Sequence, residues 1–521
     1  MDLAIKIIFL VVFFAVMIAI GIMTRKKANS VEGFVLGGRN AGPWLTAFGY
    51  GTSYFSAVVF IGYAGQFGWK YGIASTWIGI GNAVLGSLLA WIVLGRRTRV
   101  MTKHLNSKTM PDFFGKRYDS KALRITAALI SFVFLIPYTS SVYNGLSRLF
   151  NMAFNIDYKI CIIVMAALTC IYVILGGYMA TVVNDLVQGI IMLFGITAVI
   201  ATVLNNNGGF IESLSKLSQA QPDATVPAGM QGAFASFFGP DPLNLVGVIV
   251  LTSLGTWGLP QMVGKFYAIK DEKSVKAGTV ISTLFAFVVA GGCYFLGGFA
   301  RLYENDISYA DGKPMYDSII PTMLEKLPTI LIGVVIVLVL SASMSTLSSL
   351  VLTSSSTVTL DLIEQIKPKK NEDKKKREKT QLITMRLLLV FFIVVSVLLS
   401  LNPPTFIAQL MGYSWGALAG AFLAPFLWGL YWKKTTKLSV WVCFIFGVGF
   451  TVANMFLKFI ASPINAGAVT MLAGLVIVPL VSLITPKLAK DKVDGIFSCY
   501  DEKVTIEKRY SLPEEAPANE A

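Results

Sequence analysis

The sequence predicts an all-α polytopic membrane protein, and three observations lead to this fold class. Of the 521 residues, 55% are hydrophobic and only 14% are charged, whereas soluble domains carry about 25% charged residues. The mean hydropathy is +0.67. Apolar runs of about 20 residues, long enough to cross a bilayer as helices, recur from Met1 to about Thr485. No stretch between them could hold a soluble core, which excludes the three soluble domains that this length would otherwise suggest.

Hydropathy predicts about thirteen transmembrane segments, numbered 1 to 13 in chain order. Their expected ranges are 4–23, 43–66, 72–95, 124–150, 158–176, 180–205, 243–264, 277–300, 328–361, 382–401, 405–431, 438–459 and 465–485. Segment 1 is expected to be a retained span, because it lacks the basic start and the cleavage site of a secretory leader. The tail that follows segment 13 is polar and is expected to be disordered.

Lysine and arginine gather in alternate loops, and this pattern predicts the orientation. The basic loops are 25–27, 96–121, 265–276, 367–379 and 433–437, whereas 151–157, 206–242 and 301–320 are poor in basic residues. The positive-inside rule then places the N-terminus outside and the C-terminus in the cytoplasm of a multi-pass cell-membrane protein. Because these loops account for the net charge of +15, no nucleic-acid partner is expected. The 367–379 run could bind anionic lipid, although a solvated loop is favoured.

No pattern in the sequence indicates an enzyme. The five cysteines are scattered and His104 is the single histidine, so no zinc framework is available. The stretch Gly258-Leu-Pro-Gln-Met-Val-Gly264-Lys265 has five residues between its glycines, where a phosphate loop needs four, and no Ser or Thr follows the lysine. ATP-driven transport by this chain alone is therefore not expected.

Asp185 is the exception among the 29 acidic residues, nearly all of which lie in loops, in the tail or at helix ends. It falls about one and a half turns into segment 6. A carboxylate at this depth costs several kcal/mol unless it is paired or binds an ion, so it indicates a cation site. The alternative is a carboxylate that reaches back to the cytoplasmic interface and needs no ion.

Segment 9 carries a line of hydroxyl groups. Its members, Ser341, Ser345, Ser348, Ser349 and Thr353, recur at three- and four-residue spacing and therefore share one helix face. Such a face can supply oxygen ligands to a hard cation, and sodium prefers oxygen ligands. Alternatively, the hydroxyls bond their own helix backbone and pack against small residues.

Segments 2 and 7 are expected to be broken. Segment 2 contains Gly49-Tyr-Gly-Thr-Ser-Tyr-Phe-Ser-Ala57, and segment 7 contains Thr252-Ser-Leu-Gly-Thr-Trp-Gly-Leu-Pro260. Glycine pairs and proline unwind a helix and free its carbonyl groups, and paired interrupted segments in two halves of a chain indicate a transporter binding site. Segment 7 follows segment 2 by five spans, as two inverted five-helix repeats require.

Five short motifs occur in order at the expected segments. They are Gly37-Gly-Arg-Asn40, Pro111-Asp-Phe-Phe114, Gly176-Gly-Tyr-Met-Ala180, Met344-Ser-Thr-Leu-Ser348 and Tyr413-Ser-Trp-Gly416. Over roughly residues 30–480 the chain resembles the sodium/solute symporter family. The resemblance implies a leucine-transporter-type five-plus-five inverted repeat: a first helix and turn (1–30), repeats at 31–205 and 243–434 around an extracellular loop (206–242), two additional helices (435–486) and a cytoplasmic tail (487–521).

The resemblance also implies sodium as the co-transported ion, bound between segments 2 and 9. The ligands carried over from the family are the backbone oxygens of Thr52, Phe55 and Ala342 and the hydroxyls of Ser345 and Thr346. A second sodium site, present in some members, would fall on Asp185, Ser345, Ser348 and Ser349. The sodium/proline branch has an aspartate and a tryptophan where this chain has Tyr54 and Val58, so pantothenate- and monocarboxylate-like solutes are favoured over proline.

The predicted function is sodium-coupled uptake of a small organic solute that bears a carboxylate, with helix N-termini at the two breaks offering amides to it. Candidate solute contacts are Tyr54, Ser56, Tyr138, Tyr143, Thr256 and Trp257, and each aromatic side chain could equally be packing. A sodium/proline symporter is the main alternative. A channel and a proton-coupled porter are less favoured, the latter because few carboxylates and histidines lie inside the spans. The sequence assigns no oligomeric state.

Overall fold

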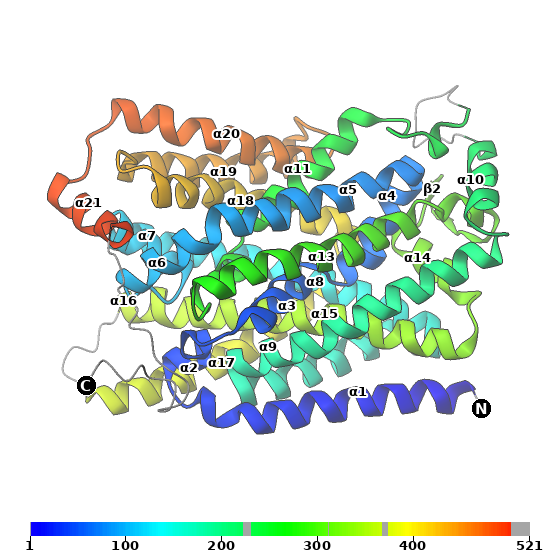
Figure 1. Ribbon diagram of the computed structural model, residues 1–521, viewed down its shortest axis with the longest axis horizontal. Helices are drawn as coiled ribbons and strands as arrows, with labels where there is room; N and C mark the ends of the chain where they lie inside the picture. The colour runs from blue at the N-terminus through cyan, green and yellow to red at the C-terminus, as the bar shows by residue number, and fades with distance from the viewer. Residues whose placement is uncertain (1, 222–230, 311, 367–372, 502–521) are drawn as a thin grey trace, which may run out of the picture.

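Long apolar helices lie side by side along the horizontal axis of Figure 1 and make up almost all of the structure. The structure is a computed structural model that describes residues 2–221, 231–310, 312–366 and 373–501. The first half contains α1 (Asp2–Thr24), α2 (Val31–Leu36), α3 (Pro43–Tyr54), α4 (Ala64–Tyr71), α5 (Thr76–Gly81), α6 (Arg96–His104), α7 (Met110–Arg117), α8 (Lys121–Phe154), α9 (Tyr158–Asn206) and α10 (Phe210–Gln219). The second half contains α11 (Pro242–Gly258), α12 (Pro260–Tyr267), α13 (Glu272–Gly297), α14 (Tyr316–Glu325), α15 (Thr329–Thr357), α16 (Glu364–Ile366), α17 (Lys374–Leu401), α18 (Ile407–Tyr431), α19 (Lys437–Leu457), α20 (Pro463–Ile484) and α21 (Lys490–Phe497).

Shorter or wider helical turns connect several of these helices. They are η1 (Arg25–Ala28), η2 (Gly37–Arg39), η3 (Val58–Tyr63), η4 (Gly72–Ser75), η5 (Asn82–Leu89), η6 (Trp91–Gly95), η7 (Ala233–Ala235), η8 (Ala300–Asp306), η9 (Val358–Ile363) and η10 (Ser498–Tyr500). The strands β1 (Tyr309–Ala310) and β2 (Lys313–Pro314) form an antiparallel pair, with Tyr309 opposite Pro314. The helical content agrees with the predicted fold class.

The described residues contain ten helices that are long and apolar enough to cross a membrane, or eleven if the bent pair of α11 and α12 forms one span. Two helical stretches, the 49 residues of α9 and the 47 residues of 58–104, are much longer than one crossing needs, and each contains a glycine with positive φ. Gly177 (φ 55°, ψ −149°) interrupts α9, and Gly72 (φ 59°) interrupts the stretch 58–104. Both glycines lie at predicted segment boundaries, but the count of thirteen spans stays a prediction.

The helices differ in how much of their surface other helices cover. In the most apolar window of α18, 89% of residues are buried, and in that of α15 the share is 78%, whereas in α1 it is 17%. The exposed residues of α1 include Leu3, Ile8, Val11 and Val12. An apolar face of this kind is stable only against another apolar phase, so we assign α15 and α18 to the core and the open face of α1 to lipid.

Glycine lines the contact of α13 with α4 and α5, which we call the glycine seam. A Cβ atom added to Gly68 would lie 1.9 Å from the carbonyl oxygen of Gly297, and one added to Gly79 would lie 2.5 Å from the Cα atom of Gly291. Both distances are shorter than any real contact, so only glycine fits at Gly68 and Gly79. The helices therefore meet backbone to backbone along this seam.

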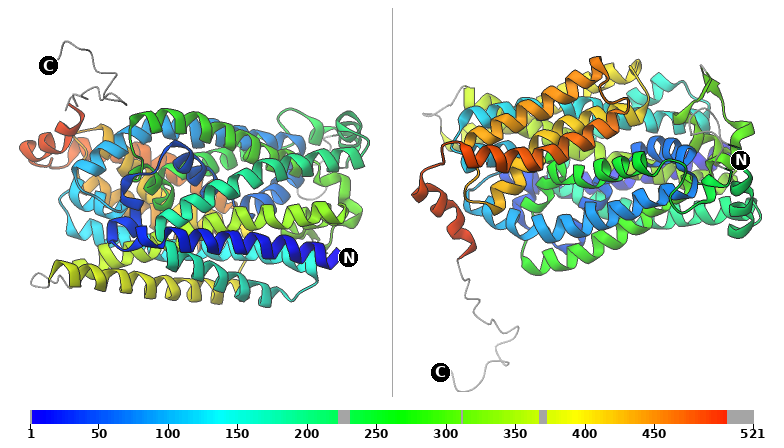
Figure 2. Two further views of the ribbon diagram at one scale, coloured as in Figure 1. Left: turned by 60° about the horizontal axis from the view of Figure 1, so that its bottom comes forward. Right: turned by 90° about the horizontal axis from the view of Figure 1, so that it is seen from above.

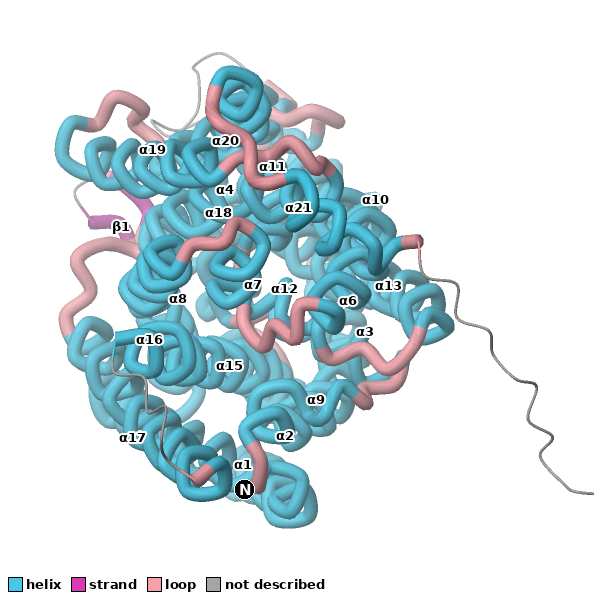
Figure 3. The backbone as a smooth tube through the Cα atoms, turned by 90° about the vertical axis from the view of Figure 1, so that its left-hand side faces the viewer, coloured by secondary structure: helices cyan, strands magenta, loops and turns pink. Residues whose placement is uncertain are grey.

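Different helices gather at the two ends of the bundle (Figures 1 and 2). The helices α6, α7, α16 and α21 gather at one end, which Figure 3 faces, whereas α10, α14 and β2 lie at the other. The N-terminal start of α1 lies at the α10 end, opposite α21, as an odd number of crossings requires. We call the α21 end the basic end, because the predicted basic loops map to it. Which end faces the cytoplasm stays a prediction.

The tail is more ordered than expected in its first part. Residues 490–497 form α21, and Val493, Ile496 and Phe497 are buried. The guanidinium group of Arg117 lies 5.0 Å from the centre of the Phe497 ring. The expectation of disorder was therefore wrong for this part of the tail, because apolar residues at helical spacing pack it against α7. Residues 502–521, and residues 367–372 of the predicted basic run, lie outside the described residues.

Candidate ion and solute site

The break predicted in segment 2 is confirmed. The helix α3 ends at Tyr54 and helical structure resumes in η3 at Val58, so that three residues separate the two. Phe55 is extended (φ −88°, ψ 113°), and the Ser56 hydroxyl accepts a hydrogen bond from the Val58 N–H at 3.1 Å. The carbonyl groups of the last turn of a helix have no partner within that helix. The break therefore places free backbone oxygens in the middle of the bundle.

The break predicted in segment 7 is also confirmed. Leu259 alone separates α11 from α12, and its extended backbone (φ −82°, ψ 122°) bends the pair by 47°. Pro260 begins α12, a position at which the missing N–H of proline costs nothing. The structure thus contains one short break in each of the two predicted repeats.

The predicted sodium ligands on α3 and α15 come together. The Ser345 hydroxyl donates to the Thr52 carbonyl at 2.8 Å. The Thr346 hydroxyl donates to the Ala342 carbonyl at 3.1 Å and to the Ser53 carbonyl at 3.2 Å. All of these residues are buried. The result is a cluster of neutral oxygens that two hydroxyls join across the two helices, which is the ligand type that a hard monovalent cation prefers.

Phe55, the fifth predicted ligand, lies at the break one residue beyond α3, and its N–H donates to the Gly51 carbonyl. Ser53 is a neighbour that sequence reasoning missed. Its carbonyl accepts from Thr346, and its hydroxyl lies 2.8 Å from the Ser349 hydroxyl. The sequence did not single out Ser53, because only its contacts with α15 in the folded structure distinguish it from the other serine of segment 2.

The residues predicted for a second sodium site are not joined by hydrogen bonds to Asp185. The Ser348 hydroxyl donates to the Ser345 carbonyl at 2.9 Å, and Ser349 pairs with Ser53. The Asp185 carboxylate instead forms an ion pair with Lys265, whose Nζ lies 3.2 Å from Oδ2. Lys265 was expected at the start of a cytoplasmic loop. That expectation was wrong, because α12 continues to Tyr267 and leaves Lys265 only 2% exposed.

Three of the predicted solute contacts lie at the α3 break, and a tryptophan joins two of them. The rings of Tyr54 and Tyr138 each lie 5.8 Å from the ring of Trp415 on α18, and Ser56 lies in the break itself. The Tyr54 hydroxyl donates to the Thr252 carbonyl of α11 at 2.9 Å. In the sequence, Trp415 was recognised only as part of the motif Tyr413-Ser-Trp-Gly416 and was not assigned to the site.

The other three predicted contacts point elsewhere. The Thr256 hydroxyl donates to the Gly86 carbonyl at 3.1 Å, and the Trp257 indole donates to the Leu85 carbonyl at 2.9 Å, so both bond η5. Tyr143 on α8 neighbours Thr169 and Cys170 of α9. The structure therefore assigns these three side chains to contacts between helices.

Several buried polar groups around the α3 break form no hydrogen bond of ordinary geometry among the described residues, although Tyr138 and Trp415 lie close enough to interact, as do Tyr294 and Asn82. They are the hydroxyls of Tyr63, Tyr138 and Tyr294, the Nδ2 group of Asn82 and the Nε1 group of Trp415. Tyr54 neighbours Tyr63, Tyr138 and Tyr294, and Tyr294 neighbours Asn82. Asn82 is fixed in place, because its Oδ1 atom accepts from the hydroxyls of Thr252 at 2.8 Å and Ser253 at 3.0 Å. Buried donors without good hydrogen bonds are costly, so this cluster is a candidate contact for a ligand.

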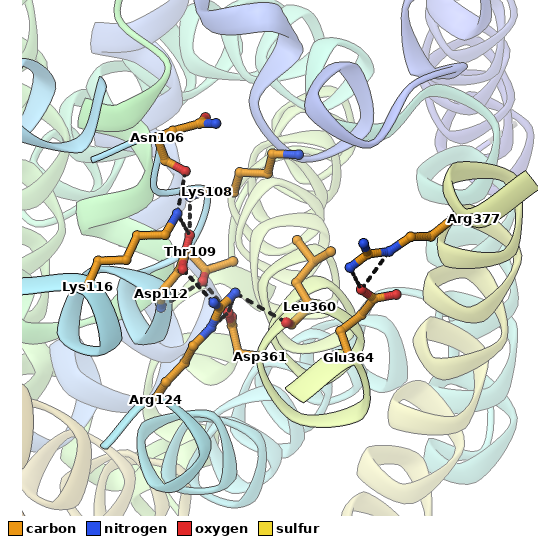
Figure 4. Close-up of polar contacts among 10 residues, drawn as sticks. All are labelled: Asn106, Lys108, Thr109, Asp112, Lys116, Arg124, Leu360, Asp361, Glu364 and Arg377. Atoms are coloured by element: carbon orange, nitrogen blue, oxygen red, sulfur yellow. Dashed lines mark hydrogen bonds and ion pairs between the residues drawn. The ribbon is translucent and has the colours of Figure 1, made fainter. Parts of the chain in front are cut away.

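A network of charges lies at the basic end (Figure 4). Arg124 at the start of α8 lies 2.8 Å from Asp112 of α7 and 2.8 Å from Asp361 of η9, which continues α15. Asp361 is fully buried. Lys116 also pairs with Asp112, at 3.0 Å. The network ties α7 and α8 to the end of α15, and sequence reasoning missed it because Asp361 falls at the edge of a predicted span.

A narrow cavity of about 40 Å³ lies between this network and the ion site. Its lining includes Lys108 and Thr109 at the basic end, and Ser349, Lys265 and Tyr178 deeper in the bundle. Lys265, the partner of Asp185, therefore borders this cavity.

Solved structures of membrane transporters share the architecture of this chain, which is the leucine-transporter-type fold. A Na⁺-coupled sialic acid symporter superposes with a TM-score of 0.76 at 15% identity, covering 93% of this chain and 98% of that one. Mhp1, a nucleobase-cation-symport-1 family transporter, superposes with a TM-score of 0.53 at 12% identity, covering 89% of this chain and 97% of that one. At these identities the likeness concerns the fold alone.

The sodium:solute symporter family model matches residues 34–447, and the chain belongs to this family. Among its relatives is the osmoregulated proline transporter OpuE of Bacillus subtilis, which is 30% identical over 445 residues, covering 85% of this chain and 87% of OpuE. The sodium/proline symporter of Staphylococcus aureus is 30% identical over 441 residues, covering 82% of each chain. The resemblance noted in the sequence is thus confirmed.

Proposed function

We propose that this transporter couples sodium entry to the uptake of a small carboxylate-bearing solute other than proline, by alternating access across the cell membrane. The observation that carries the proposal is the pairing of two clusters at one helix break. On one side of the break lies the oxygen cluster of Thr52, Ser345 and Thr346. On the other side lie the donors without good hydrogen bonds around Tyr138 and Trp415.

The chemistry of the second cluster favours an anionic group. The Trp415 indole and the Asn82 Nδ2 group can only donate hydrogen bonds, and the tyrosine hydroxyls can donate as well. A carboxylate has two oxygens with about four acceptor sites and would satisfy several of these donors at once. No Lys, Arg or His side chain is among these five groups, so neutral donors would carry the recognition.

The shared break offers a physical route for coupling. A sodium ion held by the Thr52 carbonyl would fix the end of α3, which also carries Tyr54. Tyr54 in turn contacts Trp415 and bonds Thr252. A solute that needs the same arrangement would then bind more tightly when sodium is present, and by linkage sodium would bind more tightly when the solute is present.

Proline is the alternative solute, and the two relatives described above favour it. Uptake into proteoliposomes should therefore be compared for proline, pantothenate and short monocarboxylates, each with a sodium gradient and with potassium in its place. We expect the strongest saturable, sodium-dependent uptake for a carboxylate-bearing solute other than proline. Saturable high-affinity proline uptake would show that Tyr54 does not exclude proline, and the sodium/proline symporter would replace our proposal.

One variant tests the donor cluster itself. Trp415→Phe keeps an aromatic ring against Tyr138 and removes the indole donor, so we expect the KM for the solute to rise about fivefold, the worth of one hydrogen bond of about 1 kcal/mol. The sodium concentration that gives half-maximal uptake should stay near the wild-type value.

Equal uptake rates in sodium and potassium for the wild-type protein would contradict sodium coupling, and uptake that does not saturate would favour a channel.

A further inference from the structure

The ion pair of Asp185 and Lys265 is the most deeply buried charge pair near the ion site. Asp185 on α9 is fully buried and Lys265 on α12 is 2% exposed, and the two charged atoms lie 3.2 Å apart. The ammonium group also lies 5.4 Å from the centre of the Tyr178 ring, a distance typical of a cation–π contact. The protein thus surrounds this lysine with a carboxylate and an aromatic face.

The backbone leaves room for this pair. A Cβ atom added to Gly49 of α3 would lie 3.3 Å from Asp185 Oδ2 and 3.6 Å from Lys265 Nζ. The glycine therefore lets α3 approach both charged groups at close range. Thr52, one turn further along α3, also neighbours the Asp185 carboxylate, and its carbonyl belongs to the oxygen cluster.

We propose that the Lys265 ammonium group is a built-in cation that takes the place of a second sodium ion at Asp185, so that the transporter binds a single sodium ion. This inference rests on the proposed function for the first sodium ion only. A cation beside Asp185 is needed to offset a buried carboxylate, and Lys265 already supplies that charge. A sodium ion placed at the same carboxylate would be repelled by the ammonium group within a few ångströms.

The pair also sets the charge that the first sodium ion meets. With both partners present, the charges beside Thr52 cancel. Loss of Lys265 alone leaves a carboxylate that attracts a cation, and loss of Asp185 alone leaves an ammonium group that repels one. Loss of both restores neutrality, which makes the double variant the decisive comparison.

The experiment measures saturable binding of ²²Na⁺ to the purified full-length protein in detergent, without any solute. We expect one sodium ion per wild-type protein. Lys265→Met, which keeps the length and removes the charge, should bind two sodium ions, because Asp185 and the nearby hydroxyls become available. Lys265→Arg, the matched control, should bind one. A wild-type protein that binds two ions, or a folded Lys265→Met variant that binds one, would overturn the inference.

A second pair of variants keeps the test decisive if Lys265→Met does not fold. Asp185→Asn should raise the half-saturating sodium concentration at least tenfold, because the unpaired ammonium group opposes sodium at Thr52. Asp185→Asn combined with Lys265→Met should lower that concentration again and bind one ion. If the double variant binds sodium as poorly as Asp185→Asn, then Asp185 is itself a sodium ligand and the inference is wrong.

A different measurement, sodium binding to the wild-type protein, tests the proposed function. Absence of saturable ²²Na⁺ binding to the wild type would contradict sodium coupling. A gain of one bound ion in Lys265→Met would support the built-in cation even then, because that gain reports only on the Asp185 position.

Discussion

At the scale of single residues, Ser345 and Thr346 are the hydroxyls that join α15 to the end of α3. Ser345→Ala and Thr346→Ala each remove one oxygen while keeping a small, helix-compatible residue. We expect each variant to raise the sodium concentration for half-maximal uptake about tenfold, which corresponds to ~1.4 kcal/mol for one lost ligand. The measurement is the sodium dependence of solute uptake in proteoliposomes.

Ser355→Ala is the matched control for these two variants. Ser355 lies on the same helix, is equally buried, and donates only to its own helix at the Leu352 carbonyl. Its removal should leave the sodium dependence unchanged. If Ser345→Ala and Thr346→Ala behave like Ser355→Ala, the hydroxyl face of α15 serves packing alone.

Single residues also show what the sequence could predict and what it could not. Asp185 was recognisable, because a carboxylate inside an apolar run needs a partner wherever the run folds. Its partner was not recognisable, because Lys265 lies 80 positions away in the sequence and follows a predicted span, where the positive-inside rule assigns lysine to a loop. The available signal was Pro260, because a proline at the first position of a helix predicts that a helix, here α12, begins there and continues past Lys265.

At the scale of elements, Arg124 holds α7 and α8 against η9 (Figure 4). Arg124→Met would leave Asp361 buried with only the Thr109 hydroxyl as a partner among the described contacts. Breaking a buried pair by removing one partner costs about 3–5 kcal/mol. We therefore expect the amides of α7 to exchange with deuterium at least tenfold faster, measured by mass spectrometry of the purified protein.

Arg377→Met provides the comparison at the same end of the bundle. Arg377 pairs with Glu364, and its side chain is 42% exposed, so the loss of a partly exposed pair should cost only about 0–1 kcal/mol. Exchange in α7 should stay near the wild-type rate in this variant. Equal exchange in the two variants would mean that Arg124 does not hold α7 against α8 and η9.

Elements were predictable where local chemistry decides them. Glycine and proline marked the breaks at Phe55 and Leu259, and both were found. The number of spans was less accessible, because the helices on either side of Gly72 and of Gly177 follow one another with a kink and no loop between them. The inward contacts of Thr256 and Trp257 could not be predicted either, because they depend on where η5 lies in the folded bundle.

At the scale of the whole molecule, the N-terminal start of α1 and the helix α21 lie at opposite ends. The distribution of Lys and Arg then predicts that the α21 end is cytoplasmic. A reporter enzyme that is active only in the cytoplasm should be active when fused after Lys492 and inactive when inserted in the loop 206–242. The reverse pattern would overturn the orientation, and activity at both sites would overturn the odd number of crossings.

The glycine seam decides which parts of the bundle are stiff. Where Gly68 meets Gly297, and Gly79 meets Gly291, carbonyl groups and Cα atoms touch directly, so no side chain is present that could change its rotamer to absorb a displacement. The helices α4, α5 and α13 are therefore obliged to travel as one block. Any hinge must lie outside that block, and the three residues between α3 and η3 are one place in the first repeat where the chain can flex. A motion that carries this block would turn on the same residues that border the oxygen cluster.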